Sequence, residues 1–159
     1  TGHHPTTKMC IKLIKKYVSN GFNVLDLGCG SGILGIVSIK YGAKYCLSLD
    51  IEDESVKATK QNSIDSNVEG IESEKQDLTQ SLNINFIPEL IIGNLNSYLF
   101  KEGIRNIVNA MSQNTLMIAS GILIENYEEI NKLFIENGLK EIDKYESGDW
   151  AAVVLQRDA

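Results

Sequence analysis

Acidic, apolar and glycine residues are combined in one short stretch, Val24-Leu25-Asp26-Leu27-Gly28-Cys29-Gly30-Ser31-Gly32. Its apolar first half favours a buried β-strand, and glycine at every second position from Gly28 favours a tight turn. The residues from Ile33 to Tyr41 then predict a helix that stops at Gly42. Glycines that remove Cβ atoms beside the free N–H groups of a helix N-terminus are typical of a site where a ligand lies against the main chain.

Two classes of cofactor bind at turns of this kind, and Asp26 distinguishes them. The run Gly30-Ser31-Gly32-Ile33-Leu34-Gly35 matches the G-x-G-x-x-G pattern of dinucleotide sites. In such a site the first glycine of the pattern closes the strand, whereas here the strand closes two residues earlier, at Gly28. The Asp26 carboxylate would repel a pyrophosphate but attract the sulfonium and ammonium groups of S-adenosylmethionine (SAM). The stretch therefore predicts a SAM site, and the alternative is a plain strand-to-helix turn that binds nothing.

Two further acidic residues follow apolar or weakly apolar runs. Asp50 ends the strand predicted over Tyr45 to Leu49, about 20 residues beyond the glycine turn, where a carboxylate accepts hydrogen bonds from both ribose hydroxyls. Ile51 would then lie against one face of the adenine. Asp77 ends a more polar strand predicted over Gly70 to Gln76. It is predicted to contact the adenine amino group, and the alternative is a solvated loop acid.

Asn94 follows the short apolar run Leu90-Ile91-Ile92, which predicts a central strand. Because ligands bind beyond the carboxyl ends of strands in an open α/β sheet, we expect Asn94 to project into the site. Its side-chain carbonyl is predicted to orient an incoming amine and to touch the cofactor. The Asn-Pro-Pro-aromatic motif of adenine-N6 and glutamine methyltransferases is absent from this sequence. Tyr98 and Phe100 either wall the transfer pocket or pack at the start of a helix.

The remaining periodicity supplies elements that position these residues. Four more helices are predicted: one after Pro5, one from Asp53 to about Asn67, one over Gly103 to Met111 and one over Glu125 to Asn137. In the second of these, Asp53 is predicted as the N-cap, with Val56 and Ile64 pointing inward. Further strands are predicted over Thr115 to Ala119, Leu139 to Tyr145 and Ala151 to Leu155, and a turn at Ser147-Gly148-Asp149 joins the last two. The predicted fold class is α/β, a Rossmann-like class I SAM-dependent methyltransferase fold. Its mostly parallel seven-stranded sheet would end in a C-terminal antiparallel hairpin. We expect one domain over residues 1–159.

Composition narrows the class of protein further. The net charge of -6 argues against a broad nucleic-acid surface and is compatible with a basic protein partner. No apolar run approaches the roughly 20 residues that span a bilayer, so no membrane partner is expected. Three cysteines at no metal-ligand spacing predict reduced, buried thiols in a cytoplasmic protein. The adjacent His3 and His4 have no Cys or His partners at ligand spacing, so no metal site is predicted.

The sequence resembles the PrmA-type methyltransferases, which methylate amino groups of protein L11 of the large ribosomal subunit. The segments that carry the resemblance are Thr1-Gly2-His3-His4-Pro5-Thr6-Thr7, Leu25 to Leu34, Asp50-Ile51-Glu52, Asn94, Ser120-Gly121-Ile122-Leu123 and Gly148-Asp149-Trp150. His3 replaces a threonine of the family segment, which alters one expected cofactor contact. The resemblance covers nearly the whole chain but not the family's N-terminal substrate-recognition domain, which this chain lacks.

The resemblance implies a SAM-dependent transfer of methyl groups to lysine or N-terminal amines of a basic ribosomal protein. The cofactor-binding residues would be Thr7, Asp26, Gly28, Gly30, Gly32, Asp50, Ile51, Asp77 and Asn94, with Asn94 also acting in catalysis and Thr7 touching the methionine end of SAM. The alternatives are a small-molecule N- or O-methyltransferase and a SAM-binding module with little activity alone. Because the family assigns the binding of the ribosomal protein to its other domain, this chain is expected to bind SAM but to methylate that protein slowly or not at all.

Overall fold

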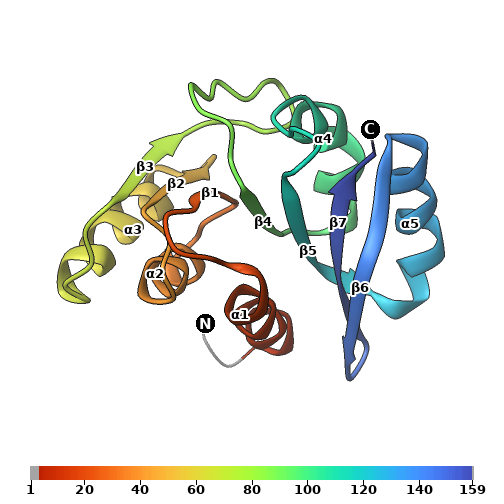
Figure 1. The fold of residues 1–159 in the computed structure, drawn as a ribbon, viewed down its shortest axis with the longest axis horizontal. Coiled ribbons are helices and arrows are strands. Elements are labelled where there is room, and N and C mark those ends of the chain that lie inside the picture. Colours follow the sequence, from red (N-terminus) through yellow and green to blue (C-terminus); the bar gives the residue numbers. More distant parts are fainter. Residues whose placement is uncertain (1–3, 159) are drawn as a thin grey trace.

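A seven-stranded sheet with helices on both faces forms the protein (Figure 1), for which a computed structural model describes residues 4–158. The strand order is β3-β2-β1-β4-β5-β7-β6. The strands are β1 (Asn23–Leu27), β2 (Tyr45–Asp50), β3 (Ile71–Lys75), β4 (Leu90–Asn94), β5 (Leu116–Leu123), β6 (Leu139–Ser147) and β7 (Trp150–Arg157). The first five pair in parallel, and β7 pairs antiparallel with both β5 and β6. The predicted fold class is confirmed.

The helices divide between the two faces of the sheet. They are α1 (Pro5–Tyr17), α2 (Ile33–Lys40), α3 (Asp53–Asp65), α4 (Ser97–Asn109) and α5 (Tyr127–Glu136), with a short 3-10 turn, η1 (Ile124–Asn126), before α5. Helices α1, α2 and α3 pack on one face, and α4 and α5 pack on the other (Figure 1). Parallel strands covered in this way are buried on both sides, which explains the continuous apolar run of β4 and the burial of Val24 to Leu27 in β1.

Alternate residues of each central strand contribute to two separate cores. In β1, Val24 packs with α1 and α2, whereas Leu25 and Leu27 pack with Phe100 of α4 and its neighbours. Because side chains alternate along a strand, Asp26 points to the same face as Val24, toward α1 and α2. This alternation decides that the acidic residue of the glycine stretch is surrounded by the α1 and α2 core.

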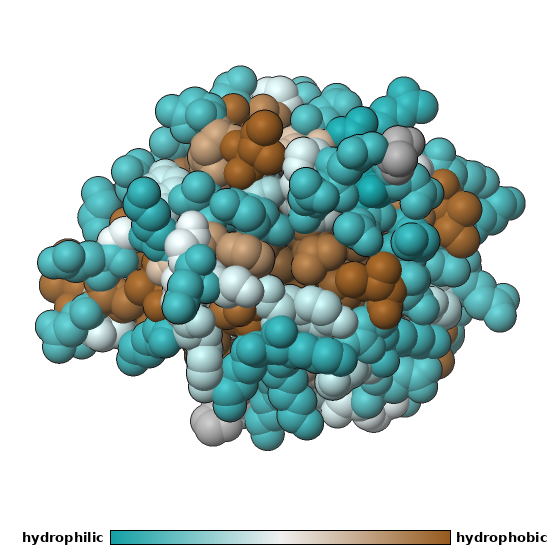
Figure 2. All heavy atoms as spheres, viewed as in Figure 1, coloured by the Kyte–Doolittle hydropathy of each residue, from teal (hydrophilic) through white to brown (hydrophobic). Residues whose placement is uncertain are grey.

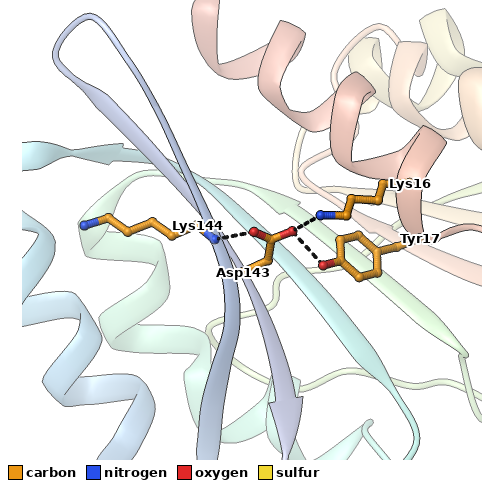
Figure 3. Close-up of polar contacts among 4 residues, drawn as sticks. All are labelled: Lys16, Tyr17, Asp143 and Lys144. Atoms are coloured by element: carbon orange, nitrogen blue, oxygen red, sulfur yellow. Dashed lines mark hydrogen bonds and ion pairs between the residues drawn. The ribbon is translucent and has the colours of Figure 1, made fainter.

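Helix α1 is held against the sheet at both ends. Near its end, the Lys16 ammonium and the Tyr17 hydroxyl both donate to Asp143 Oδ2, at 2.7 and 2.6 Å (Figure 3). These hydrogen bonds hold the pKa of the Asp143 carboxyl below its ordinary value. At its start, the Ser120 hydroxyl of β5 donates to the Thr6 carbonyl, at 3.3 Å. The helix therefore places its first turn beside the carboxyl ends of the strands.

Two predicted element boundaries near the site are wrong. Helix α4 begins at Ser97 rather than Gly103, because the Asn96 side chain accepts a hydrogen bond from the Leu99 N–H, at 2.9 Å, and caps the helix. Strand β5 continues to Leu123 rather than Ala119, because its pairing with β7 resumes after a bulge between Ala119 and Ile122. Both differences extend regular structure toward the site.

Two predicted details of α3, the Asp53 N-cap and the inward Ile64, are also wrong, whereas Val56 is half-buried. Glu52 occupies the N-cap position without a side-chain cap, and Asp53 lies inside the helix, where it pairs with Lys75 at 3.4 Å. Ile64 is 62% exposed, and the buried residues of this helix are Thr59 and Ser63. Small polar residues face the sheet because α3 approaches the glycine turn closely.

Two predictions from composition can be compared with the described residues. Cys10, Cys29 and Cys46 are unpaired and buried, as predicted, and burial raises the pKa of Cys29 to about 12, so its thiol stays protonated at neutral pH. Across residues 4–158, every helix is too short or too polar to span a bilayer. The face shown in Figure 2 is largely hydrophilic, and its hydrophobic residues occur in patches between polar side chains.

Candidate functional site

The glycine stretch forms the turn between β1 and α2. Gly28, Gly30 and Gly32 have φ angles of 67°, 53° and 86°, a region that side chains other than glycine rarely adopt. The turn is closed by a hydrogen bond of 2.8 Å from the Gly32 N–H to the Cys29 carbonyl. A Cβ at Gly32 would lie 2.8 Å from Thr59 of α3, so the close approach of α3 adds a second requirement for glycine. The predicted strand, turn and helix are confirmed.

Asp50 ties this turn to the neighbouring strand. Its Oδ2 accepts a hydrogen bond of 3.0 Å from the Gly30 N–H, and its Oδ1 accepts one of 2.9 Å from the Glu52 N–H. Each carboxylate oxygen thus retains a free lone pair, in a group whose orientation is already set by two backbone donors. A carboxylate oriented in this way can accept hydrogen bonds from two vicinal hydroxyls, such as those of a ribose.

A cavity of about 250 Å³ lies next to Asp50, at the carboxyl ends of β1, β2 and β4. It is lined by Leu27, Gly28, Leu49, Asp50, Ile51, Gln76, Asp77, Leu78, Asn94, Leu95, Asn96 and Leu99. We call it the donor cavity. Five of the predicted site residues, Gly28, Asp50, Ile51, Asp77 and Asn94, therefore meet in one place. Apolar walls with two carboxylates and no cationic side chain fit an adenosine that carries a positive sulfonium.

Asp77 contributes to the loop as well as to the cavity wall. Its Oδ1 accepts hydrogen bonds from the Thr79 N–H and hydroxyl, at 2.9 and 2.7 Å, while its backbone carbonyl accepts from Gln80 and Ser81. This arrangement is an Asx-turn, in which the aspartate side chain accepts a hydrogen bond from the N–H two residues later. One carboxylate oxygen of Asp77 therefore stabilises the loop, and the residue also lines the cavity.

A second, more open cavity of about 460 Å³ adjoins the first. It is lined by His4, Thr6, Asn94, Leu95, Asn96, Ser97, Tyr98, Gly121, Leu123, Asn126 and Trp150, and we call it the acceptor cavity. The segment Asn94-Leu95-Asn96 lines both cavities and is the wall they share. Of the two aromatic residues considered from the sequence, Tyr98 is 63% exposed at this cavity, whereas Phe100 is fully buried in the core.

His4 and Trp150 were not predicted as site residues, and their contact joins the two ends of the chain. Their rings meet edge to face with centroids 5.4 Å apart. His4 also caps α1, because its Nδ1 accepts a hydrogen bond of 3.2 Å from the Thr6 N–H. The position of His4 directly before Pro5 is a helix-start signal, but no local pattern indicates that Trp150 lies beside it.

We expect His4→Ala to lower the free energy of unfolding by about 1 to 2 kcal/mol, through loss of the cap and of the ring contact. Urea unfolding followed by the fluorescence of Trp150, the only tryptophan, measures this change. His4→Asn restores a capping side chain without the ring, so about half of the loss should return. Equal stability of all three proteins would show that neither contact stabilises the start of α1.

Gly121 sets the position of the wall that the two cavities share. Its φ angle is 86°, and a Cβ there would collide with the Leu95 carbonyl and approach Asn94 Oδ1 to 3.2 Å. Gly121→Ala is therefore expected to displace Asn94 and to lower any transfer activity more strongly than cofactor affinity. Gly138→Ala is the matched control, because Gly138 has a φ angle of 80° with nothing within 4 Å of a Cβ. If both variants lose activity equally, backbone strain alone explains the effect.

Asp26 and Thr7 are buried and line neither cavity. The Asp26 carboxyl is 1% exposed, and its Oδ2 is the only buried side-chain polar atom among residues 4–158 without a hydrogen-bond partner. Burial, with a contribution from the nearby Asp50 carboxylate, raises the pKa of Asp26 to about 7. Thr7, 7% exposed, lies in the first turn of α1. Their predicted contacts with SAM stay predictions, and His3 lies outside the described residues.

Solved structures share the arrangement of this sheet and turn. The chain matches a crystal structure of a ribosomal protein L11 methylase from Lactobacillus delbrueckii subsp. bulgaricus with a TM-score of 0.91 and 28% identity, over 99% of this chain and 81% of that chain. An S-adenosylmethionine-dependent methyltransferase from Clostridium acetobutylicum has the same fold, with a TM-score of 0.82 and 14% identity, over 99% of this chain and 94% of that chain. The sheet order and the glycine turn define a class I SAM-dependent methyltransferase fold.

The family model for ribosomal protein L11 methyltransferase (PrmA) matches residues 1–158, and the chain belongs to this family, whose cofactor is SAM. Ribosomal protein L11 methyltransferase from Dictyoglomus turgidum is 34% identical over 158 residues, which are 99% of this chain and 52% of the relative. The protein of the same name from Caldicellulosiruptor saccharolyticus is 34% identical over 157 residues, 99% of this chain and 51% of the relative. The chain thus spans about half the length of these curated relatives.

Proposed function

We propose that this chain transfers a methyl group from SAM to an amino group of a ribosomal protein of the L11 type. The observation that carries the proposal is the segment Asn94-Leu95-Asn96, which lines both a donor cavity that fits SAM and an open acceptor cavity. Family membership supports both the cofactor and the kind of acceptor. The relatives' names support a protein acceptor over a small-molecule acceptor.

The protein's part in this reaction is alignment. SAM supplies an electrophilic methyl group on a sulfonium. Asp50 would accept the ribose hydroxyls and Ile51 would cover the adenine, which holds the donor in place. The Asn94 carbonyl would accept a hydrogen bond from the amine and direct its lone pair along the S–CH₃ axis, at about 3 to 3.5 Å for attack. Positioning of this kind, together with exclusion of water, supplies most of the rate enhancement in a direct displacement, which needs neither a metal nor a covalent enzyme intermediate.

The acceptor amine would lose its proton before it enters the acceptor cavity. None of the side chains that line this cavity is a carboxylate or an ammonium, and His4 Nδ1 already accepts a hydrogen bond from the Thr6 N–H. A wall of amides and aromatic rings offers no counter-ion, so it favours the neutral amine over the ammonium. We therefore infer that water takes the proton and that none of the described residues lining this cavity acts as general base.

The recognition of the whole ribosomal protein would use residues beyond this chain. We infer that residues 1–159 form one cofactor domain, because the strand-end face is taken up by the two cavities and the curated relatives are about twice as long. Transfer of labelled methyl to purified ribosomal protein L11 tests the proposal. This chain should methylate it slowly or not at all, and a fusion with the upstream half of the Dictyoglomus turgidum relative should methylate it much faster.

Three outcomes of this experiment are informative. Methyl incorporation by either protein supports the proposed function. Equal rates from the two proteins would place recognition within these residues and contradict the two-part arrangement. No incorporation by either protein, although both bind S-adenosylhomocysteine, would overturn the proposed acceptor.

A further inference from the structure

Beside the acceptor cavity lies a hollow of about 470 Å³, lined by Leu123, Ile124, Glu125 and Asp149. Leu123 lines both spaces, and Glu125 and Asp149 each precede a residue of the acceptor cavity, Asn126 and Trp150. The Ile124 N–H donates to the Asp149 carbonyl, at 2.8 Å, which ties η1 to the turn between β6 and β7. The two hollows therefore adjoin each other at Leu123, and together they are here called the acceptor groove.

The two ends of the acceptor groove differ in charge. The end beside Asn94 carries amides and aromatic rings, whereas the far end carries the carboxylates of Glu125 and Asp149. Both acidic residues are exposed, and no lysine or arginine of residues 4–158 forms an ion pair with either. By contrast, the neighbouring Glu129 and Glu146 are paired with Lys101 and Lys144.

The strand pairing gives the approximate length of the acceptor groove. Ser120 pairs with Asn94 across β4 and β5, and Leu123 pairs with Trp150 across β5 and β7. Three residues along a strand span at most about 10 Å, and the bulge between Ala119 and Ile122 shortens this distance. An extended peptide covers the same distance in about three residues.

We propose that the acceptor groove binds an extended basic segment of the protein acceptor, with the reacting lysine at Asn94 and a second cationic side chain, about three residues away, at Glu125 and Asp149. This inference rests on the proposed function and adds a specificity determinant to it. The neutral end requires an uncharged amine, so attraction of a basic segment to the site must come from the far end. A flanking lysine or arginine stays charged and in water there, where an exposed ion pair costs little desolvation.

The test uses two blocked peptides with one lysine and, three residues away, either arginine or the neutral isostere citrulline. Each is titrated into the chain with S-adenosylhomocysteine, and binding is followed by the fluorescence of Trp150, which lies in the acceptor groove. The arginine peptide should bind about tenfold more tightly, the size of one or two exposed ion pairs. The double variant Glu125→Gln/Asp149→Asn should remove this preference, and raising the salt concentration should reduce it.

The matched control is Glu69→Gln/Glu128→Gln, which removes two exposed charges that line neither hollow. It should keep the tenfold preference. Equal affinity for the two peptides, or a preference that survives Glu125→Gln/Asp149→Asn, would overturn the inference. Labelled methyl transfer to the peptide lysine separates the two proposals. Transfer without a preference for the arginine peptide contradicts only the proposed role of Glu125 and Asp149. Preferential binding without transfer to any peptide or to the ribosomal protein contradicts the methyl transfer itself.

Discussion

Asp50→Ala is expected to weaken the binding of SAM by roughly 10- to 150-fold. The Asp50 carboxylate lies at the donor cavity with its orientation set by the Gly30 and Glu52 N–H groups. Its removal leaves the ribose hydroxyls without a charged partner, at a cost of about 1.5 to 3 kcal/mol. It also releases the N–H of Gly30, so the glycine turn keeps only the hydrogen bond from the Cys29 N–H to the Leu49 carbonyl as a link to β2. Calorimetric titration with SAM and with S-adenosylhomocysteine measures the change.

Two further variants separate binding from folding in this experiment. Asp50→Asn keeps an oxygen acceptor but no charge, so its Kd should lie between those of the wild type and Asp50→Ala. Asp65→Asn removes an exposed carboxylate at the end of α3, remote from the donor cavity, and should leave the Kd unchanged. An unaltered Kd for Asp50→Ala would exclude Asp50 from the cofactor site.

The second large effect is expected from Asp26→Asn, which should increase the stability of the ligand-free protein but weaken the binding of SAM. Since burial raises its folded pKa to about 7 from 3.8, the folded state holds a proton that the unfolded state releases between about pH 4 and 7. The free energy of unfolding should therefore fall as the pH rises through this window, by about 4 kcal/mol from this group. Asp26→Asn, which cannot ionise, should flatten that dependence and stabilise the ligand-free protein above pH 7.

The same substitution should weaken the binding of SAM. The unpartnered Oδ2 carries a negative charge above pH 7 that no group of the described chain neutralises, and a cationic ligand at the adjoining turn would neutralise it. Urea unfolding from pH 4 to 9, with SAM titrations at pH 8, measures both effects. Stabilisation with an unchanged Kd would show that Asp26 acts on the turn alone. A stability curve with the wild-type pH dependence in Asp26→Asn would assign that dependence to other groups.

The sequence by itself determined the local construction of the donor cavity. A strand, a glycine turn and a helix are encoded in neighbouring residues, because apolar alternation, positive-φ glycines and a helix stop act over a few positions. The spacing from the turn to Asp50 also follows from the sequence. A parallel crossover returns the next strand beside the first, and the observed pairing places Asp26 opposite Ser48, two residues before Asp50. The position of Asn94 was also predictable, because it ends β4 and ligands bind beyond the carboxyl ends of the strands in an open α/β sheet.

Only the tertiary structure decided how the acceptor side is assembled. His4 and Trp150 are separated by nearly the whole sequence, and they meet because α1 crosses the sheet to β5 and β7. Gly121 reaches Leu95 through a bulge in the β5–β7 pairing, which no periodicity predicts. Whether Asp26 faces a cavity or a core depends on which helices cover its side of β1. Such contacts are set by packing between distant elements, whereas the sequence pattern reports only what each segment requires of its nearest neighbours.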